Sequence, residues 1–251
     1  MHHYRSRILE ELQGIKHYIS EKRAAEPLGF SLALHTGEDP ALVGANRRRV
    51  AEFFGPDASF VSALQVHGDR IYAVERSESR GWELPDESLK ADALITRLPK
   101  VVLTILTADC VPILLTDPVT GAVGAVHAGW KGSALKIVEK TVARLQEAYG
   151  VNPADLRAFI GPSIGGCCYE VGEEVAEEFR GVEGAVHPGT RGRPMLDLKE
   201  VNHTQLLAAG LCDRQIEISP VCTVCERERF FSYRAEGGCS GRFMSCIMRE
   251  G

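Results

Sequence analysis

Residues 101–133 read VVLTILTADCVPILLTDPVTGAVGAVHAGWKGS, and this stretch decides the fold. Its apolar runs are bounded by the turn-forming pairs Asp109-Cys110 and Asp117-Pro118, which predicts consecutive strands. Few polar residues interrupt the runs, so we expect strands that are buried on both faces at the centre of a sheet. The predicted strands are residues 101–107, 112–116 and 121–126.

Segments on both sides of this stretch add helices and further strands. The glycine-rich turn Gly129–Gly132 leads into residues 133–149, whose apolar side chains recur at helical spacing. Asp39 as cap and Gly55 as stop predict a second helix, Pro40–Phe54. The other predicted helices are residues 4–12, 171–179 and 201–209, and the other predicted strands are residues 15–20, 60–66, 70–74, 93–96, 156–160, 216–221 and 242–247.

The composition bounds the class of protein. With 251 residues, 44% hydrophobic and 25% charged, and no repeat or linker, the chain fits one α/β or α+β domain. A net charge of -5 and a single short basic run, Arg47–Arg49, argue against a nucleic-acid partner. No apolar stretch could span a membrane and the first residues do not resemble a secretory signal, so we expect a cytoplasmic protein. We expect its eight cysteines to be reduced, since two are adjacent and no disulfide framework is apparent.

His67, Cys110 and His127 each directly follow a predicted strand. Strand ends can converge at one rim of a sheet, and a catalytic zinc takes three nitrogen or sulfur ligands with one position left open. These three residues are therefore our candidate metal ligands. Their wide spacing has no compact signature such as H-E-x-x-H, so structural roles for each remain the alternative on spacing alone.

Short ordered motifs beyond Leu32 give the chain a resemblance to a known family. The motifs are Leu64–Gly68, Ala91–Leu94, Thr107–Pro112, His127–Gly132, Ile160–Gly165, Cys167–Gly172, Cys222–Cys225 and Arg229–Arg234. Together they resemble the YfiH-like family. The resemblance implies one α+β catalytic domain over residues 1–251, with mixed β-sheets packed together and flanked by helices. Residues 1–30 are a variable amino-terminal segment, because Ser20–Ala25 replace the glycine turn usual in the family.

The same resemblance implies a chemistry. Members of the family hold zinc through the residues that match His67, Cys110 and His127. They were formerly described as polyphenol oxidases or laccase-domain proteins, and are now regarded as purine nucleoside phosphorylases that also deaminate adenosine and split methylthioadenosine. A copper-dependent polyphenol oxidase remains an alternative, because two imidazoles and a thiolate also bind copper. The chain has eight His and no His-x-His pair, and one copper could not complete a laccase cycle.

Phosphorolysis requires an anion site and groups that handle protons. Our candidate substrate-binding residues are Lys131, in the turn before the predicted helix, and the neighbours Asn46 and Arg47. A packed turn would explain Lys131 equally well, and a solvated helix face would explain Arg47 equally well. Asp92 is a candidate general acid or base. For Asp109 we expect a structural hydrogen bond, since strand alternation directs it away from Cys110.

Parts of the sequence are also compatible with two other classes of protein and with a second type of metal site. Ser163 lies in a G-x-S-x-G pattern after a strand, so a serine hydrolase is an alternative function, but Asp197 and His203 are too close in sequence to complete a triad. A non-enzymatic metal-binding or regulatory module is a third class, which the density of motifs disfavours. A structural zinc site is also conceivable; its cysteines would be Cys222, Cys225, Cys239 and Cys246. We expect buried thiols there instead, because the last two are widely spaced.

The sequence thus predicts a zinc-dependent purine nucleoside phosphorylase that acts on adenosine and inosine with phosphate. His67, Cys110 and His127 are the predicted metal ligands, and Asp92 is the candidate general acid or base. Adenosine deamination and methylthioadenosine phosphorolysis are expected side activities. The partners are small molecules, with neither nucleic acid nor membrane, and a homodimer is left open.

Overall fold

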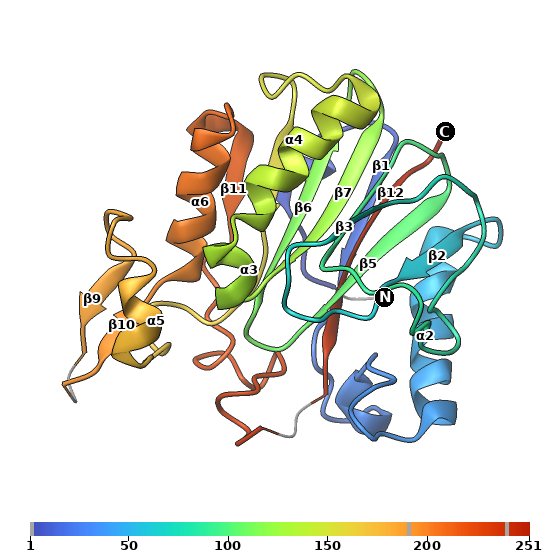
Figure 1. The fold of residues 1–251 in the computed structure, drawn as a ribbon. Helices are drawn as coiled ribbons and strands as arrows, with labels where there is room; N and C mark the ends of the chain where they lie inside the picture. Colours follow the sequence, from blue (N-terminus) through green and yellow to red (C-terminus); the bar gives the residue numbers. More distant parts are fainter. Residues whose placement is uncertain (1–2, 190–191, 239–240) are drawn as a thin grey trace.

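The computed structural model describes residues 3–189, 192–238 and 241–251, which form four layers (Figure 1). Two β-sheets pack face to face in the middle. Helix α2 (Pro40–Phe54) covers the outer face of one sheet, and helices α4 (Ile137–Tyr149) and α6 (Leu198–Ala208) cover the outer face of the other. This arrangement confirms the predicted α+β class of mixed sheets flanked by helices.

The strands form one large sheet, one smaller sheet and a separate pair. The strand bounds are β1 Ile15–Ile19, β2 Ser59–Ser62, β3 Ile71–Ala73, β4 Ala93–Thr96, β5 Val101–Thr107, β6 Val111–Asp117, β7 Ala122–Ala128, β8 Arg157–Ile160, β9 Val186–Pro188, β10 Pro194–Leu196, β11 Ile216–Ile218 and β12 Phe243–Arg249. The large sheet has the order β11-β8-β6-β7-β4-β3, antiparallel at its centre and parallel at both edge pairs. The smaller sheet has the order β1-β12-β5-β2, and β9 pairs with β10 alone.

The remaining helices are short. They are α1 Arg7–Glu10, α3 Trp130–Ala134 and α5 Glu173–Glu177, with 3-10 turns at Pro27–Phe30 and Asp213–Gln215. Among the described residues no helix is long and apolar enough to cross a membrane.

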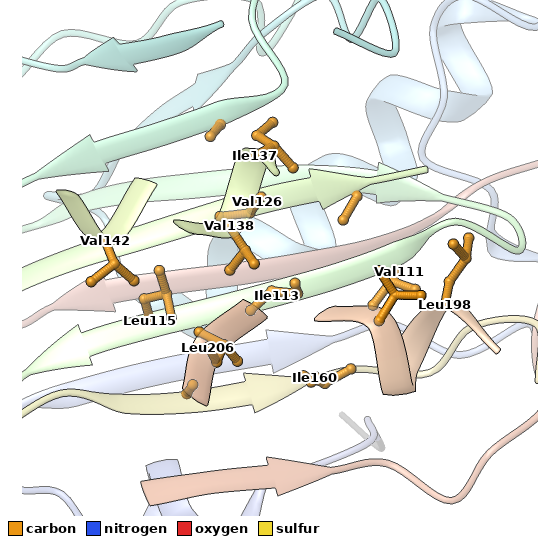
Figure 2. Close-up of a cluster of buried hydrophobic side chains, with 14 of the residues drawn as sticks. Val111, Ile113, Leu115, Val126, Ile137, Val138, Val142, Ile160, Leu198 and Leu206 are labelled. Atoms are coloured by element: carbon orange, nitrogen blue, oxygen red, sulfur yellow. The ribbon is translucent and has the colours of Figure 1, made fainter. Parts of the chain in front are cut away.

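The period-2 alternation of strand side chains divides the core into layers. Along β7, Val126 packs toward the helices, where Figure 2 shows it with Ile113 and Val138, whereas Val123 and Ala125 pack between the two sheets. Each such buried aliphatic side chain stabilises the fold by about 1.5–3 kcal/mol. The same alternation puts His127 on the side between the sheets, at the end of β7.

Helix α2 matches the sequence prediction at both ends. The Asp39 side chain accepts a hydrogen bond from the Ala41 N–H at 2.8 Å, and Gly55, with φ 99°, ends the helix. Pro40 occupies the first position, where its missing N–H costs no hydrogen bond. Local capping chemistry alone was therefore sufficient to place this helix.

The single helix predicted for residues 133–149 is wrong, because the structure splits it into α3 and α4. The Ser133 carbonyl accepts the side-chain amide of Gln205 at 2.7 Å and the Lys136 N–H at 3.0 Å, so it is not bonded to the next helical turn. Lys136 adopts a left-handed conformation with φ 59° between the two helices. A contact from distant α6 thus overrides local helical periodicity.

Candidate metal centre

His67, Cys110 and His127 come together in space. Their candidate ligand atoms all lie within 4.8 Å of one another. Cys110 lies in the turn between β5 and β6, and His127 lies within β7. His67 is not at a strand end as predicted, since β2 already stops at Ser62. Its loop is instead fixed by Gln65, whose side-chain amide exchanges two 2.8 Å hydrogen bonds with the Leu106 backbone at the end of β5.

The Asp92 carboxylate forms hydrogen bonds with both His67 and His127. One of its carboxylate oxygens lies 2.8 Å from His127 Nδ1 and accepts the His67 N–H at 2.9 Å, and the other accepts the Gly68 N–H at 2.8 Å. Burial would raise the pKa of this fully buried carboxyl, but His127 and the backbone N–H groups outweigh burial and lower its pKa. The predicted acid–base role of Asp92 therefore needs correction: both oxygens are engaged, and its geometry suits positioning.

In the interior of the site, Cys110 and His127 shift each other's pKa in opposite directions. Burial raises the pKa of Cys110, but the charge of His127 and hydrogen bonds from both histidines lower it to about 6. Burial lowers the pKa of His127, but Cys110 and Asp92 raise it to about 9. The lowered pKa of Cys110 favours the thiolate, which is the form in which a cysteine binds a metal ion.

The donors and their surroundings fit a metal ion. Two imidazoles and one thiolate are the nitrogen and sulfur ligands of catalytic zinc sites, and a carboxylate behind a ligating histidine is a usual companion of such sites. A Cβ at position 129 would lie 3.1 Å from both Cys110 Sγ and His67 Cδ2. Any residue other than glycine there would push against these two candidate ligands. His67 is exposed and His127 is buried, so the cluster is open on one side.

That open side faces a cavity of about 470 Å³, at the end of the layer between the two sheets. The cavity brings together the candidate ligands with aromatic, aliphatic, polar and cationic side chains from distant parts of the sequence. Besides the three ligands, its lining includes His35, Gln65, Thr107, Ile164, Tyr169, Tyr233, Arg234 and Arg242. Its size suits a drug-sized or nucleoside-sized molecule.

Two arginines give the cavity its positive charge. The Arg234 guanidinium lies 5.3 Å from the Tyr169 ring centroid, and that of Arg242 lies 5.7 Å from the Tyr233 ring centroid. Desolvation lowers the pKa of His35, and the charge of Arg242 lowers it further. Sequence reasoning assigned no role to either arginine. Arg234 stands within a quoted motif, which was the available signal, whereas no motif marks Arg242.

Arg47 and Asn46 do not reach this cavity. The Arg47 side chain is 3% exposed and donates hydrogen bonds to the Leu32, Gly81 and Trp82 carbonyls. Asn46 donates to the Pro27 and Ser31 carbonyls. The predicted substrate-binding roles of both residues therefore need correction, since their donors tie down irregular segments around α2.

Lys131 also lies outside the cavity lining. It is exposed, and its ammonium is 5.5 Å from the Trp130 ring centroid in the short helix α3. The role predicted for it in anion binding finds no support in this geometry. Asp109 behaves as expected, because its carboxylate accepts hydrogen bonds from Thr223 Oγ1 and the Arg234 N–H, both at 2.6 Å.

The geometry does not support a serine nucleophile. Ser163 is fully buried, and its Oγ has no hydrogen-bond partner in the described part of the chain. His203 is paired with Asp213 at 2.8 Å, and Asp197 caps α6. The hydrolase alternative is therefore wrong for Ser163, because no base can reach its hydroxyl.

The cysteines predicted to be buried thiols divide into separate groups. Cys222 and Cys246 are buried, as expected, and Cys246 lies in β12 beneath α2. Cys225 is exposed, and Cys239 lies outside the described residues. Cys222 and Cys225 instead adjoin Cys167 and Cys168.

Comparisons with known proteins agree with the predicted family. A family described as multi-copper polyphenol oxidoreductase laccase matches residues 20–250. Purine nucleoside phosphorylase YlmD of Bacillus subtilis is 38% identical, with 88% of this chain and 82% of that protein covered. The crystal structure of the hypothetical protein YfiH of Bacillus licheniformis has a TM-score of 0.89 at 39% identity, covering 94% and 93% of the two chains. The crystal structure of YlmD from Geobacillus stearothermophilus has a TM-score of 0.88 at 35% identity, covering 98% and 94%. On this agreement of sequence, fold and motif order, the chain belongs to the YfiH/YlmD family of laccase-like proteins.

Proposed function

We propose that this protein is a zinc-dependent purine nucleoside phosphorylase that acts on adenosine and inosine. The observation that carries the proposal is the open His67–Cys110–His127 cluster in the wall of a cavity that also holds two arginines. Relatives that carry the name purine nucleoside phosphorylase, from several bacteria, support the reaction class.

Zinc fits the donor set better than the copper centre of an oxidase. A laccase cycle needs several coppers, whereas this cluster offers one thiolate and two imidazoles around a single position. Zinc bound there would act as a Lewis acid, polarising a substrate atom or lowering the pKa of water. His67, Cys110 and His127 would hold it, with Asp92 fixing the orientation of His127.

The cavity residues supply the other requirements of phosphorolysis. In this reaction an oxygen of hydrogen phosphate forms a bond to C1′ of the ribose as the bond from C1′ to the purine nitrogen breaks. The purine nitrogen keeps the electron pair and takes up the proton that the phosphate gives up, which yields ribose 1-phosphate and the free base. Arg234 and Arg242 line the cavity and would bind the phosphate, because guanidinium groups pair with phosphate oxygens in a bidentate manner. Tyr169 and Tyr233 offer aromatic surfaces to the purine.

Deamination of adenosine and cleavage of methylthioadenosine belong to the same proposal as side activities. Both need the purine in the same cavity, and deamination needs an attacking water in place of phosphate. Adenosine would then give inosine and ammonia without phosphate.

The test is to incubate the purified protein with inosine in the presence and absence of phosphate and to assay hypoxanthine and ribose 1-phosphate. We expect both products only with phosphate, and we expect Cys110→Ala to lose both products together with the zinc of the cavity site. Cys212→Ser is the matched control, because this cysteine is exposed and belongs to neither cysteine cluster. Hypoxanthine release at the same rate with and without phosphate would exclude a phosphorylase. Oxygen uptake with a phenol after copper loading would favour the oxidase.

A further inference from the structure

Four cysteines gather at a second place in the molecule. Cys167 and Cys168 lie in the loop after β8, and Cys222 and Cys225 lie in the loop after β11. Their four sulfur atoms all lie within 4.8 Å of one another, and Cys110 is not among them. Two loops that are separated by more than fifty residues thus meet through thiols.

The spacing of the sulfurs fits four ligands around one ion. Cys167 Sγ lies 3.7 Å from Cys168 Sγ and 3.8 Å from Cys225 Sγ, and Cys168 Sγ lies 3.5 Å from Cys225 Sγ. A tetrahedron with zinc–sulfur bonds of about 2.3 Å has edges of about 3.8 Å. A disulfide would need sulfurs about 2.05 Å apart. The observed distances are those of a tetrahedral thiolate shell.

The backbone and a nearby cation are arranged for thiolates. Cys222 Sγ accepts the Gly165 N–H at 3.3 Å, and the N–H groups of Val224 and Cys225 also point to it. The Lys199 side chain is buried, and its ammonium donates to the Ser219 and Val221 carbonyls in the loop that carries Cys222. Four thiolates around a divalent ion carry two net negative charges, which these donors and this cation offset in part.

We propose that Cys167, Cys168, Cys222 and Cys225 form a second, structural metal site that binds zinc through four thiolates. The site has no open ligand position, as is usual for structural zinc. It is independent of the proposed function, since it shares no ligand with the cluster in the cavity.

The site would brace the walls of the cavity. The loop with Cys167 and Cys168 also carries Ile164 and Tyr169, and the loop with Cys222 and Cys225 leads to Tyr233 and Arg234, all of which line the cavity. The backbones of the two loops also meet at the bridge between Ser163 and Cys222. A zinc there fixes the separation of these walls.

Cobalt-substituted Cys110→Ala protein gives a direct test. This variant has no thiolate in the cavity cluster, so any sulfur-to-cobalt charge-transfer absorption must come from other cysteines. We expect strong absorption of this kind, and we expect native mass spectrometry of zinc-loaded Cys110→Ala to show a bound zinc. Adding Cys225→Ser should remove or greatly weaken the absorption, whereas adding Cys212→Ser should leave it unchanged.

The wild-type chain provides a measurement that does not depend on the folding of a variant. Under reducing conditions we expect two zinc ions per chain, and one after the cavity site alone is lost in Cys110→Ala. Cys110→Ala without charge-transfer absorption, or a disulfide between Cys168 and Cys225 detected by peptide mass in freshly prepared reduced protein, would overturn the proposal. Wild-type protein that binds two zinc ions but produces no ribose 1-phosphate would count against the proposed function only.

Discussion

His127 Nδ1 lies 2.8 Å from an oxygen of Asp92, and the same oxygen accepts the His67 N–H at 2.9 Å. One buried carboxylate therefore orients two of the three candidate ligands, one through its ring and the other through its backbone. His67 has φ 60°, a conformation that is unfavourable for a residue with a side chain, and the Asp92 carboxylate holds it there. The metal centre is thus preorganised by a residue that does not itself coordinate.

Asp92→Asn is expected to weaken zinc binding by about 10–100-fold, the usual effect of losing a carboxylate behind a ligating histidine. The amide cannot accept from all these N–H groups as a charged acceptor would, and it can turn an NH₂ donor toward His127. Chelator competition measures the zinc affinity. Asp69→Asn is the matched control, because Asp69 lies on the loop that carries His67 but forms an exposed ion pair with Lys140. Equal affinity in Asp92→Asn and wild-type protein would remove the positioning role.

The metal-free protein is expected to show an unusually reactive Cys110. Its pKa is lowered to about 6, so the thiolate is the main form at neutral pH and is lost as the pH falls through about 6. Iodoacetamide alkylation of Cys110, followed by peptide mass spectrometry, should therefore level off above pH 7, whereas an ordinary thiol has a pKa of about 8.5 and reacts faster up to about pH 9.

The shape of that profile depends on His127, whose charge is the main influence lowering the thiol pKa. In His127→Gln the alkylation midpoint should move to higher pH, because only the weaker influence of His67 then opposes burial. An unchanged midpoint in this variant would show that the imidazolium does not stabilise the thiolate.

Several parts of the molecule were accessible from sequence because their causes are local. The apolar runs at β5, β6 and β7 have no polar face to expose, so only central strands could accommodate them. The caps of α2 were legible in Asp39 and Gly55. Predicting the three candidate metal ligands required the motif resemblance, because only the pairing of β6 with β7 brings Cys110 near His127.

Other parts depend on tertiary contacts that leave no local pattern. The sequence predicted that Arg47 binds substrate or lies on a solvated helix face, yet its partners are the carbonyls of segments 15 and 34–35 residues distant. The cavity forms only where the two sheets end together, so the grouping of Arg234 with Arg242 was not visible in sequence. The cysteine cluster likewise requires the β8 and β11 loops to be neighbours, as their parallel pairing makes them.

Arg242→Gln should raise the KM for phosphate by about tenfold or more, since a charge-assisted hydrogen bond contributes about 1.5–3 kcal/mol. The KM for inosine should change less, because the purine and ribose keep their other contacts. Initial rates over a range of phosphate concentrations measure both constants. Lys131→Gln distinguishes the cavity from the glycine-rich turn as the anion site: we expect the phosphate KM of this variant to match the wild type. A raised phosphate KM in Lys131→Gln but not in Arg242→Gln would show that the glycine-rich turn is the anion site.

Arg47→Lys tests whether the basic run of α2 serves the fold. The Arg47 guanidinium reaches the Leu32 carbonyl through both Nε and Nη2, at 2.9 and 2.7 Å, and the Gly81 and Trp82 carbonyls through Nη1. A lysine ammonium is a single point of charge and cannot span the two sets of carbonyls, so buried acceptors lose their partners. We expect the free energy of unfolding to fall by about 3 kcal/mol, measured by urea denaturation. Arg48→Lys, at the exposed neighbouring position, should change it by less than about 0.5 kcal/mol. A raised phosphate KM in Arg47→Lys without loss of stability would instead show that the guanidinium serves the substrate.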